Sequence, residues 1–387
     1  MFSFTQMKIA SRIFDFLRAS IPVFTVMIFT QPAFSDPIGD RPVKVLIAGV
    51  SHGHVDWILA RDRNLRDIEI VGLQDQNSAH LQWLAQKYNF QSSMLFRDLD
   101  QAIEATRPDG VLAFGAVDEH LAVVRSAVRA RIPVMMEKPL AHRLEDAVEM
   151  QRLSEQSGIP LLVNYESNWY PALERVMEAA LEPKRLPISR LSFETGHWGP
   201  IELGAKPEFL DWLLKPERGG GALLDFGVYG AGIATVLLEG QSPVSVQADV
   251  RTTKPHLYPG VEDDAHIRIN YAQAQVEIHA SWSLPSSLKT ATISTKDEVW
   301  HQRTANHFTV TTGDGKLHEH ELSQLKESSL YFDAFSYFAQ FVRGNVRPNS
   351  QRPLSRVLSL ETNVMIMRIM DAAQRSVVSQ KPEALRY

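Results

Sequence analysis

Short apolar segments alternate with longer amphipathic segments through the first half of the chain, between Val43 and Val163. The apolar segments have the length of strands that are buried on both faces, and the segments between them have helical periodicity. Strand–helix alternation at this spacing predicts a parallel, doubly wound sheet. The predicted strands are Val43–Ala48, Ile68–Leu73, Gly110–Phe114, Ile132–Met136 and Pro160–Val163, and the predicted helices include Ala79–Tyr88, Glu119–Ala130 and Leu144–Gln156.

The pattern changes after about Asn164, where strand-like runs follow one another over short connections. Such runs are typical of a largely antiparallel sheet. We therefore expect an α/β chain with an N-terminal Rossmann dinucleotide-binding domain (41–163) and a C-terminal α+β domain with a mostly antiparallel sheet (164–387). The later segments are helices at Ala172–Ala180, Tyr331–Arg343 and Pro353–Val378, and strands at Ser189–Thr195, Val244–Arg251, Ala265–Tyr271, Ala274–Ser281 and Thr290–Ser294.

The first 35 residues have the layout of a secretory signal peptide: a positively charged start, an apolar middle and small residues before Asp36. The apolar stretch contains Pro22 and Pro32 and is short for a bilayer span of about 20 residues. A permanent membrane anchor is thus the weaker alternative, and we expect no stable span after processing. The pattern predicts export, with the periplasm as the destination.

The composition is that of an ordinary globular protein, with 44% hydrophobic and 22% charged residues in 387. The net charge of -5 does not suggest a nucleic-acid partner, which would require a basic stripe. The chain has no cysteine, which excludes disulfides, thiolate catalysis and cysteine-bound zinc.

A candidate phosphate-binding turn follows the first predicted strand. Its residues are Gly49, Ser51, His52, Gly53 and His54, and the glycine pattern departs from G-x-G-x-x-G at Ser51. A tight turn without a ligand is the simpler alternative. The two histidines alone do not make a metal site, so no metal is predicted.

Asp75 supports the dinucleotide interpretation. It ends the second predicted strand, where a carboxylate usually binds the hydroxyls of the adenosine ribose. No basic residue follows before Lys87, so NAD is favoured and NADP is the alternative. A solvated acid or a helix cap would explain Asp75 without a ligand.

Two further segments suggest proton-transfer chemistry. Glu137-Lys138-Pro139 follows an apolar strand, and Asp225 and Tyr229 lie four residues apart after the glycines 219–221, on one face of a predicted helix. Each residue alone has an ordinary structural explanation, such as a loop start, a first-turn acid or a core aromatic. Together, a lysine, a carboxylate and a phenol make a candidate active site.

These segments resemble the glucose–fructose oxidoreductase / inositol dehydrogenase family, often called Gfo/Idh/MocA, over nearly the whole chain from Val43. The runs 115–120, 261–265 and Ser281-Trp282 are also similar to family signatures. The resemblance implies an NAD(P)-dependent dehydrogenase that acts on the CH–OH group of a sugar, cyclitol or related polyol. It also makes a homo-oligomer the expected assembly.

The resemblance implies roles for single residues. Lys138 would lie beside the nicotinamide and move the proton, and Asp225 would bind a substrate hydroxyl next to Tyr229. Ala116, His120 and Glu137 would lie along the cofactor with Lys138. The chain departs from the family at Ser51, at Asn168, where arginine is frequent, and at Leu213, where Trp-Arg is frequent.

The chemistry expected from the residues is proton removal while a hydride leaves a sugar carbon. The ammonium of Lys138 is expected to stabilise the phenolate of Tyr229 and so to lower its pKa from about 10. Asn164, Trp198 and Trp212 are candidate substrate contacts with Asp225 and Tyr229, although the tryptophans would equally pack a seam between domains.

Two alternative functions fit the same residues. Some relatives of this family cleave glycosidic bonds by transient oxidation with a retained NAD, which suits an exported protein. A non-catalytic ligand-binding protein of the same fold would explain the altered glycine turn.

Overall fold

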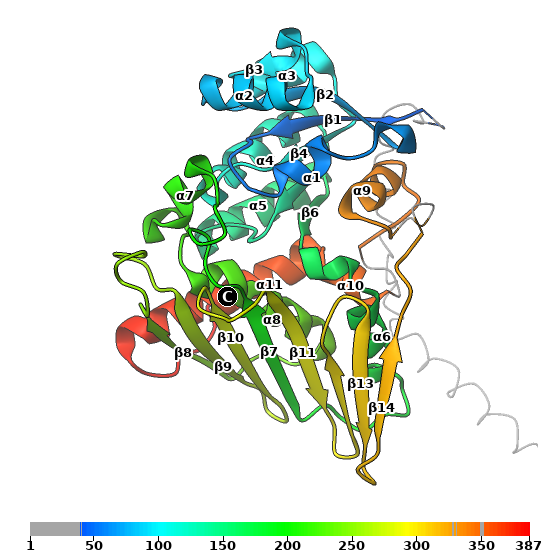
Figure 1. The fold of residues 1–387 in the computed structure, drawn as a ribbon, viewed down its shortest axis with the longest axis vertical. Coiled ribbons are helices and arrows are strands. Elements are labelled where there is room, and N and C mark those ends of the chain that lie inside the picture. The colour runs from blue at the N-terminus through cyan, green and yellow to red at the C-terminus, as the bar shows by residue number, and fades with distance from the viewer. Residues whose placement is uncertain (1–38, 40, 327–328, 330, 349–351) are drawn as a thin grey trace, which may run out of the picture. The chain divides into compact units, whose positions relative to one another are not determined.

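The computed structural model describes residues 39, 41–326, 329, 331–348 and 352–387. The predicted signal peptide therefore lies outside the described residues. Figure 1 shows two sheets, one above the other in that view, with helices around the upper sheet and along the lower one.

The first sheet is parallel, with six strands in the order β3-β2-β1-β4-β5-β6. This order places the change of winding direction between β1 and β4, where doubly wound sheets bind ligands at the carboxyl ends of the strands. The strands are β1 (Val43–Ala48), β2 (Ile68–Gln74), β3 (Leu95–Phe96), β4 (Gly110–Ala113), β5 (Val134–Glu137) and β6 (Leu161–Asn164).

Side-chain caps mark the start of two helices in this first half, α2 and α3. Asn77 accepts a hydrogen bond from the backbone of His80, and Asp98 accepts one from the backbone of Gln101, which satisfies N–H groups that a helix leaves free. The helices are α1 (Val55–Leu59), η1 (Arg63–Leu65), α2 (Ser78–Tyr88), η2 (Ser92–Met94), α3 (Leu99–Thr106), η3 (Val117–Glu119), α4 (His120–Ala130) and α5 (Leu144–Ser157).

The second sheet has eight strands in the order β14-β13-β12-β11-β7-β10-β9-β8. All neighbours are antiparallel except β7 and β10. The strands are β7 (Arg190–Gly196), β8 (Ser245–Arg251), β9 (Asp264–Asn270), β10 (Gln275–Ser281), β11 (Leu288–Ser294), β12 (Glu298–Gln302), β13 (His307–Thr312) and β14 (Leu317–Glu321).

Helices cover one face of the second sheet. α8 packs on β7 and β10, and α11 packs on β8 and on α8. Side chains in the central strands alternate between buried and solvent-accessible, which is the pattern of a sheet covered on one face. The helices of this half are η4 (Glu166–Trp169), α6 (Pro171–Ala180), α7 (Pro207–Leu213), η5 (Pro216–Arg218), α8 (Ala222–Leu237), α9 (Ala334–Val342), α10 (Pro353–Val357) and α11 (Leu360–Ser379).

One helix of the C-terminal half returns to the first sheet. Phe335 and Phe338 of α9 belong to the same buried cluster as Val45 and Leu112 of β1 and β4. Arg61 fixes this helix further, because it pairs with Asp67 and, at 2.8 Å, with Asp333 before α9.

The predicted fold class is confirmed: a parallel Rossmann-like sheet is followed by a mostly antiparallel one. Several elements were not predicted, among them α3 and β12–β14. β14 reads Leu-His-Glu-His-Glu and is exposed along its length, so it carries no alternation of apolar and polar residues.

Among the described residues, one helical stretch, Pro216–Leu237, is long and apolar enough to cross a membrane. Its most apolar window is 94% buried inside the fold. This stretch therefore has the character of a core helix.

Candidate active site

Lys138 and Asp225 form a buried ion pair where β5 ends and α8 begins. The ammonium of Lys138 contacts Oδ1 of Asp225 and donates to the backbone carbonyl of the same residue at 3.1 Å. The indole of Trp282 donates to Oδ2 of Asp225 at 2.8 Å. Both carboxylate oxygens are thus engaged, and the lysine is held at a defined position.

Electrostatics keep Asp225 ionised. Burial alone would raise the pKa of this carboxyl, but the ammonium of Lys138, with smaller contributions from His197 and the Trp282 indole, lowers it below its ordinary value. The predicted role of Asp225 as a charged, orienting group agrees with this direction.

Tyr229 lies one helical turn beyond Asp225. The Lys138 nitrogen is 5.5 Å from the centre of its ring and 5.3 Å from that of Phe226. Burial raises the pKa of Tyr229 well above 10, and the carboxylates of Glu166, Glu137 and Asp225 raise it further.

The expected lowering of the Tyr229 pKa is therefore wrong. The sequence pairs the phenol with Lys138 alone, whereas in the fold Asp225 contacts the lysine and acidic groups surround the phenol. Tyr229 keeps its proton at neutral pH and can donate a hydrogen bond.

Lys289 and Glu166 belong to the same site and were not predicted. The ammonium of Lys289 on β11 lies 5.7 Å from the centre of the Tyr229 ring and 5.9 Å from that of Phe226. It also pairs with Glu166 of η4 at 2.7 Å. Two lysines thus flank the same pair of aromatic rings. The pattern of apolar and polar residues in β11 does not show that Lys289 reaches this pair.

His197 is the third unpredicted member. Its ring packs edge-on against Phe226, with ring centres 5.0 Å apart, and its Nδ1 accepts the backbone N–H of Gly199 at 3.0 Å. Burial, and then the nearby lysines, lower its pKa to about 4. The imidazole is therefore neutral at pH 7, and the Gly199 contact leaves its proton on Nε2. The only sequence signal was its place beside Trp198.

The turn after β1 is built around two facing glycines. Gly49 has φ of +71°, and a side chain there would overlap the backbone of Gly115 after β4. A Cβ at Gly53 would meet nothing within 4 Å, so this part of the turn has open space in front of it.

Polar atoms at this turn are left for a ligand. The Ser51 hydroxyl and His52 Nε2 are buried without a hydrogen-bond partner. Asp75 accepts the backbone N–H groups of Val50 and Asn77, both at 2.8 Å, and so ties the end of β2 to the turn.

A cavity of about 260 Å³ opens beside this turn, at the carboxyl ends of β1, β2 and β4. Its lining includes Gly49, Gly115 and four carboxylates, and no lysine or arginine. The carboxylates are Asp75, Asp98, Asp100 and Glu119. The space, the free polar atoms and the position of Asp75 fit an NAD whose ribose carries no phosphate.

Glu137 connects the turn to the active site. Its carboxylate contacts His54 at 3.1 Å and the amide of Asn164 at 2.8 Å, and that amide in turn accepts the indole N–H of Trp169. Burial would raise the pKa of Glu137, but His54, His52 and Asn164 outweigh it and lower the pKa to about 2.

The structure brings most of the predicted residues together. Trp212 is buried and stacks on His52 with ring centres 6.0 Å apart, while His120 contacts the Leu140 carbonyl and the Ala116 N–H contacts Glu119. Trp198, in contrast, is 42% exposed.

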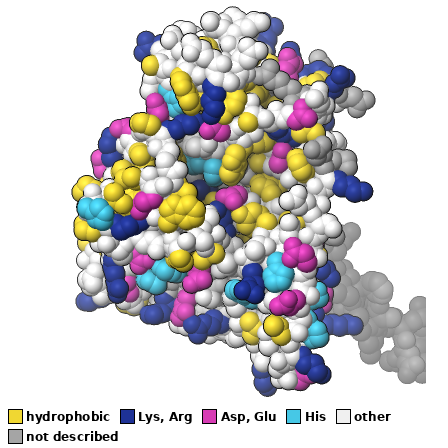
Figure 2. All heavy atoms as spheres, viewed as in Figure 1, with side chains coloured by type: hydrophobic (Ala, Val, Ile, Leu, Met, Phe, Trp, Pro, Cys, Tyr) yellow, Lys and Arg dark blue, Asp and Glu magenta, His cyan; other side chains and the backbone are white. Residues whose placement is uncertain are grey.

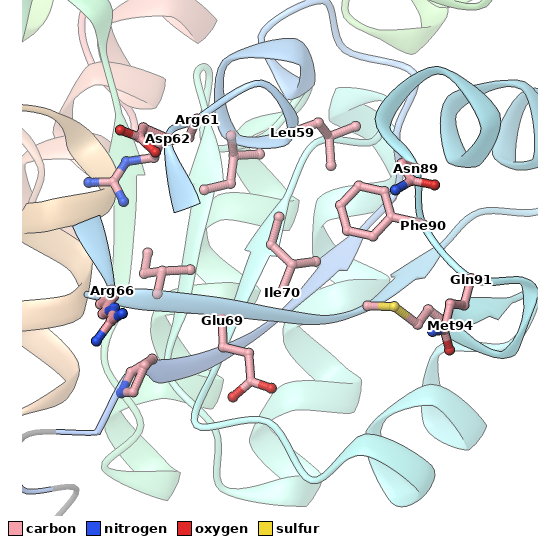
Figure 3. Close-up of a pocket in the computed structure, with 13 residues that line it drawn as sticks. Leu59, Arg61, Asp62, Arg66, Glu69, Ile70, Asn89, Phe90, Gln91 and Met94 are labelled. Atoms are coloured by element: carbon pink, nitrogen blue, oxygen red, sulfur yellow. The ribbon is translucent and has the colours of Figure 1, made fainter. Parts of the chain in front are cut away.

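A separate cavity of about 470 Å³ lies between α1 and β2 (Figure 3). In Figure 3, Ile70 and Phe90 lie at its centre and Arg66 and Glu69 along one side. None of its lining residues belongs to the sites described above.

Comparison with known proteins adds to this geometry. Residues 43–165 match the model of an oxidoreductase family with an NAD-binding Rossmann fold, GFO_IDH_MocA, and residues 188–299 match a C-terminal domain of the same family. The chain belongs to the Gfo/Idh/MocA family. The resemblance noted in the sequence is thereby confirmed, and the matched segments contain Lys138, Asp225, Tyr229 and Lys289.

Named relatives include dehydrogenases of sugars and diols. The chain is 31% identical to D-apiose dehydrogenase of Paraburkholderia graminis over 30% of its own length and 31% of the relative's. It is 26% identical to trans-1,2-dihydrobenzene-1,2-diol dehydrogenase of Xenopus laevis over 70% of its own length and 79% of the relative's. The match to a yeast protein is 27% identical over 51% of this chain and 56% of that protein. The chain thus spans between 31% and 56% of the length of the first relatives.

Solved structures share the fold over most of the chain. An aldose-aldose oxidoreductase from Caulobacter crescentus has a TM-score of 0.71 at 19% identity, covering 89% of this chain and all of that one. An inositol dehydrogenase homolog from Azotobacter vinelandii, solved with NAD+, has a TM-score of 0.72 at 15% identity. The match covers 88% of this chain and 96% of that one.

Proposed function

We propose that this protein is an NAD-dependent oxidoreductase that transfers hydride between the cofactor and a CH–OH group of a sugar, cyclitol or related polyol. The observation that carries the proposal is the buried Lys138–Asp225 pair, held over Phe226 and Tyr229 beside the dinucleotide turn. The family and the dehydrogenase relatives support this reaction class.

The acidic cavity beside Gly49 favours NAD over NADP. A 2′-phosphate would face Asp75 and Asp98; Arg129 pairs with Asp100 and Arg218 lies 3.7 Å from Glu119, but neither arginine lines this cavity. We expect Asp75 to accept hydroxyls of an unphosphorylated ribose.

A dinucleotide held at the Gly49–His54 turn and by Asp75 would supply the hydride acceptor for oxidation, or the hydride donor for reduction. In the reducing direction the ammonium of Lys138 donates its third proton to the substrate oxygen, because Asp225 takes the other two donor positions; in the oxidising direction the neutral amine accepts the hydroxyl proton. Asp225 fixes the ammonium. Tyr229 and the Nε2–H of His197 stay protonated and orient the substrate oxygens.

The first test is mass spectrometry of small molecules released from the denatured, natively purified chain. We expect NAD without NADP, followed by NADH formation when the protein is assayed against a panel of aldoses, cyclitols and diols. A chain that carries no dinucleotide and binds no added NAD in calorimetry would overturn the proposal.

We also propose that the protein is exported and that residues 1–35 are removed. The support is the signal-peptide pattern of the sequence. N-terminal sequencing of protein recovered from a periplasmic fraction should begin at Asp36. Recovery in the cytoplasm with an intact Met1 would contradict export.

We propose further that the solvent-facing side of the second sheet packs against a second copy. Helices cover only its other side, and a wide exposed sheet face favours self-association. Light scattering after size-exclusion chromatography should give a mass at least twice that of one processed chain. The unprocessed chain is 43.6 kDa.

A further inference from the structure

Two histidines and an aspartate meet on the solvent-facing side of the second sheet. His266 on β9 and His279 on β10 are directly opposite each other in the antiparallel register, so their side chains share one face. Asp264 lies two residues before His266 and therefore points to the same side. Figure 2 shows charged side chains and histidines spread over the part of the molecule that contains this sheet.

The three side chains converge. The imidazole rings are stacked, 4.2 Å apart with planes at 8°, and both present Nε2 to the same carboxylate. His279 Nε2 is 2.7 Å from Asp264 Oδ1, and His266 Nε2 is 3.6 Å from Oδ2. One ligand atom from each residue lies within 4.8 Å of the other two.

We propose that Asp264, His266 and His279 form a zinc site. Two imidazoles and a carboxylate are a three-ligand set that zinc uses, with a fourth position open to water. Metal–ligand bonds of about 2.0–2.1 Å place ligand atoms about 3.3 Å apart in a tetrahedron. In the structure the two rings are parallel, so the exposed His266 ring has to turn out of its stack on His279 for both Nε2 atoms to face one ion.

Burial and charge suit an ion at this place. The Asp264 side chain is 12% exposed and that of His279 26%, so these two ligands are held by the sheet, while His266 at 56% is free to adjust. Asp249 is directly opposite His266, and Glu194 is directly opposite His279. These carboxylates add negative charge on either side of the imidazoles. Two arginines lie nearby and carry positive charge: Arg251 is directly opposite Asp264, and Arg268 lies two residues beyond His266 on β9.

The site is separate from the proposed active site. The one other group of this kind among the described residues, His52, His54 and Glu137, belongs to the dinucleotide turn. All three ligands come from one chain. The sequence does not reveal the site, because 13 residues separate the histidines and only the β9–β10 register aligns them.

The test is titration of the full chain, purified without a histidine tag and stripped of metal, with zinc chloride in a calorimeter. We expect one zinc per chain for the wild type and affinity at least tenfold weaker in His266→Ala and His279→Gln. His320→Ala is the matched control, because His320 also stacks on an aromatic ring of the same sheet, 4.6 Å from Phe308. It should bind zinc as the wild type does.

Cobalt provides a second readout. Co²⁺ should give the intense visible absorption of a tetrahedral site in the wild type and in His320→Ala, and lose it in His266→Ala, whose exposed position leaves the fold intact. No saturable uptake, equal affinity in His266→Ala and the wild type, or only the weak spectrum of octahedral cobalt would each overturn the proposal.

Discussion

Lys138 brings a positive charge into a nearly dry site, where it is 5% exposed. Asp225 neutralises it, and the Trp282 indole occupies the second carboxylate oxygen. The position of the ammonium is therefore set by two residues from the second half of the chain. Tyr229, beside it, is dominated by burial and by acids, so the two groups that the sequence suggests as partners have different roles.

This division predicts different effects of two substitutions. Lys138→Met removes the proton that the substrate exchanges and should lower kcat about 10²–10⁴-fold. Tyr229→Phe removes only a hydrogen bond and should cost about tenfold or less. Steady-state kinetics over pH 6 to 10 compares them, with Trp198→Phe as a surface control.

The pH profile separates the two roles further. In Tyr229→Phe, the pH dependence of kcat/KM should keep the shape of the wild type, because the phenol stays protonated throughout. Loss of an ionisation near neutral pH in this variant, with turnover reduced as much as in Lys138→Met, would show that Tyr229 is the proton carrier.

Glu137 links acid stability to the cofactor turn. Its pKa falls from 4.5 to about 2 on folding, so the unfolded chain binds the proton more tightly. The stabilisation is therefore present above pH 4.5 and is lost as pH falls towards 2. At neutral pH it amounts to about 3 kcal/mol by linkage.

Urea denaturation between pH 3 and 7 tests this assignment. The difference in unfolding free energy between the wild type and Glu137→Gln should shrink as pH falls. Glu155→Gln is the control, because Glu155 is exposed on α5. A difference that stays constant with pH would contradict the role of the Glu137 charge.

The elements show how far the sequence could be interpreted. Five of the six strands of the first sheet were predicted within about two residues, since buried parallel strands are short apolar runs between helices, whereas the two-residue strand β3 was not. β12–β14 were not: the edge strand β14 is exposed along its length, and β12 and β13 bury only a few side chains among polar residues. In the site, Lys138 and Asp225 were predicted, whereas Lys289 and His197 reach it only through the pairing of β7 with β11.

In the turn after β1, alanine substitutions at Gly49 and Gly53 should have different effects on stability. Gly49→Ala places a Cβ against the Gly115 backbone at φ of +71° and should destabilise the protein by about 2–4 kcal/mol. Gly53→Ala meets nothing within 4 Å and should stay within about 0.5 kcal/mol of the wild type.

Chemical denaturation of both variants, with and without NAD, checks this contrast. The added methyl of Gly53→Ala projects into the open part of the turn, so NAD should stabilise this variant less than the wild type. If both substitutions destabilised the protein equally, the close contact between Gly49 and the Gly115 backbone would not be what makes Gly49 necessary.

At the scale of the whole molecule, the C-terminal half is attached to the first sheet by α9. Gly110 of β4 leaves room for Phe338, whose ring would be 2.6 Å from a Cβ at this glycine. Arg61 joins Asp67 and Asp333 on the same side. The first sheet thus depends on a helix that comes more than 150 residues after its last strand.

Phe338→Ala should therefore destabilise the protein by about 3–5 kcal/mol, because it leaves a cavity between α9 and the sheet. Phe341→Ala, on the same helix but less buried, should cost less. Since both halves share this contact, residues 36–387 should unfold in one cooperative transition, followed by tryptophan fluorescence and circular dichroism together. If Phe338→Ala instead unfolds in two separate transitions and the second sheet is as stable as before, then α9 stabilises the first sheet alone.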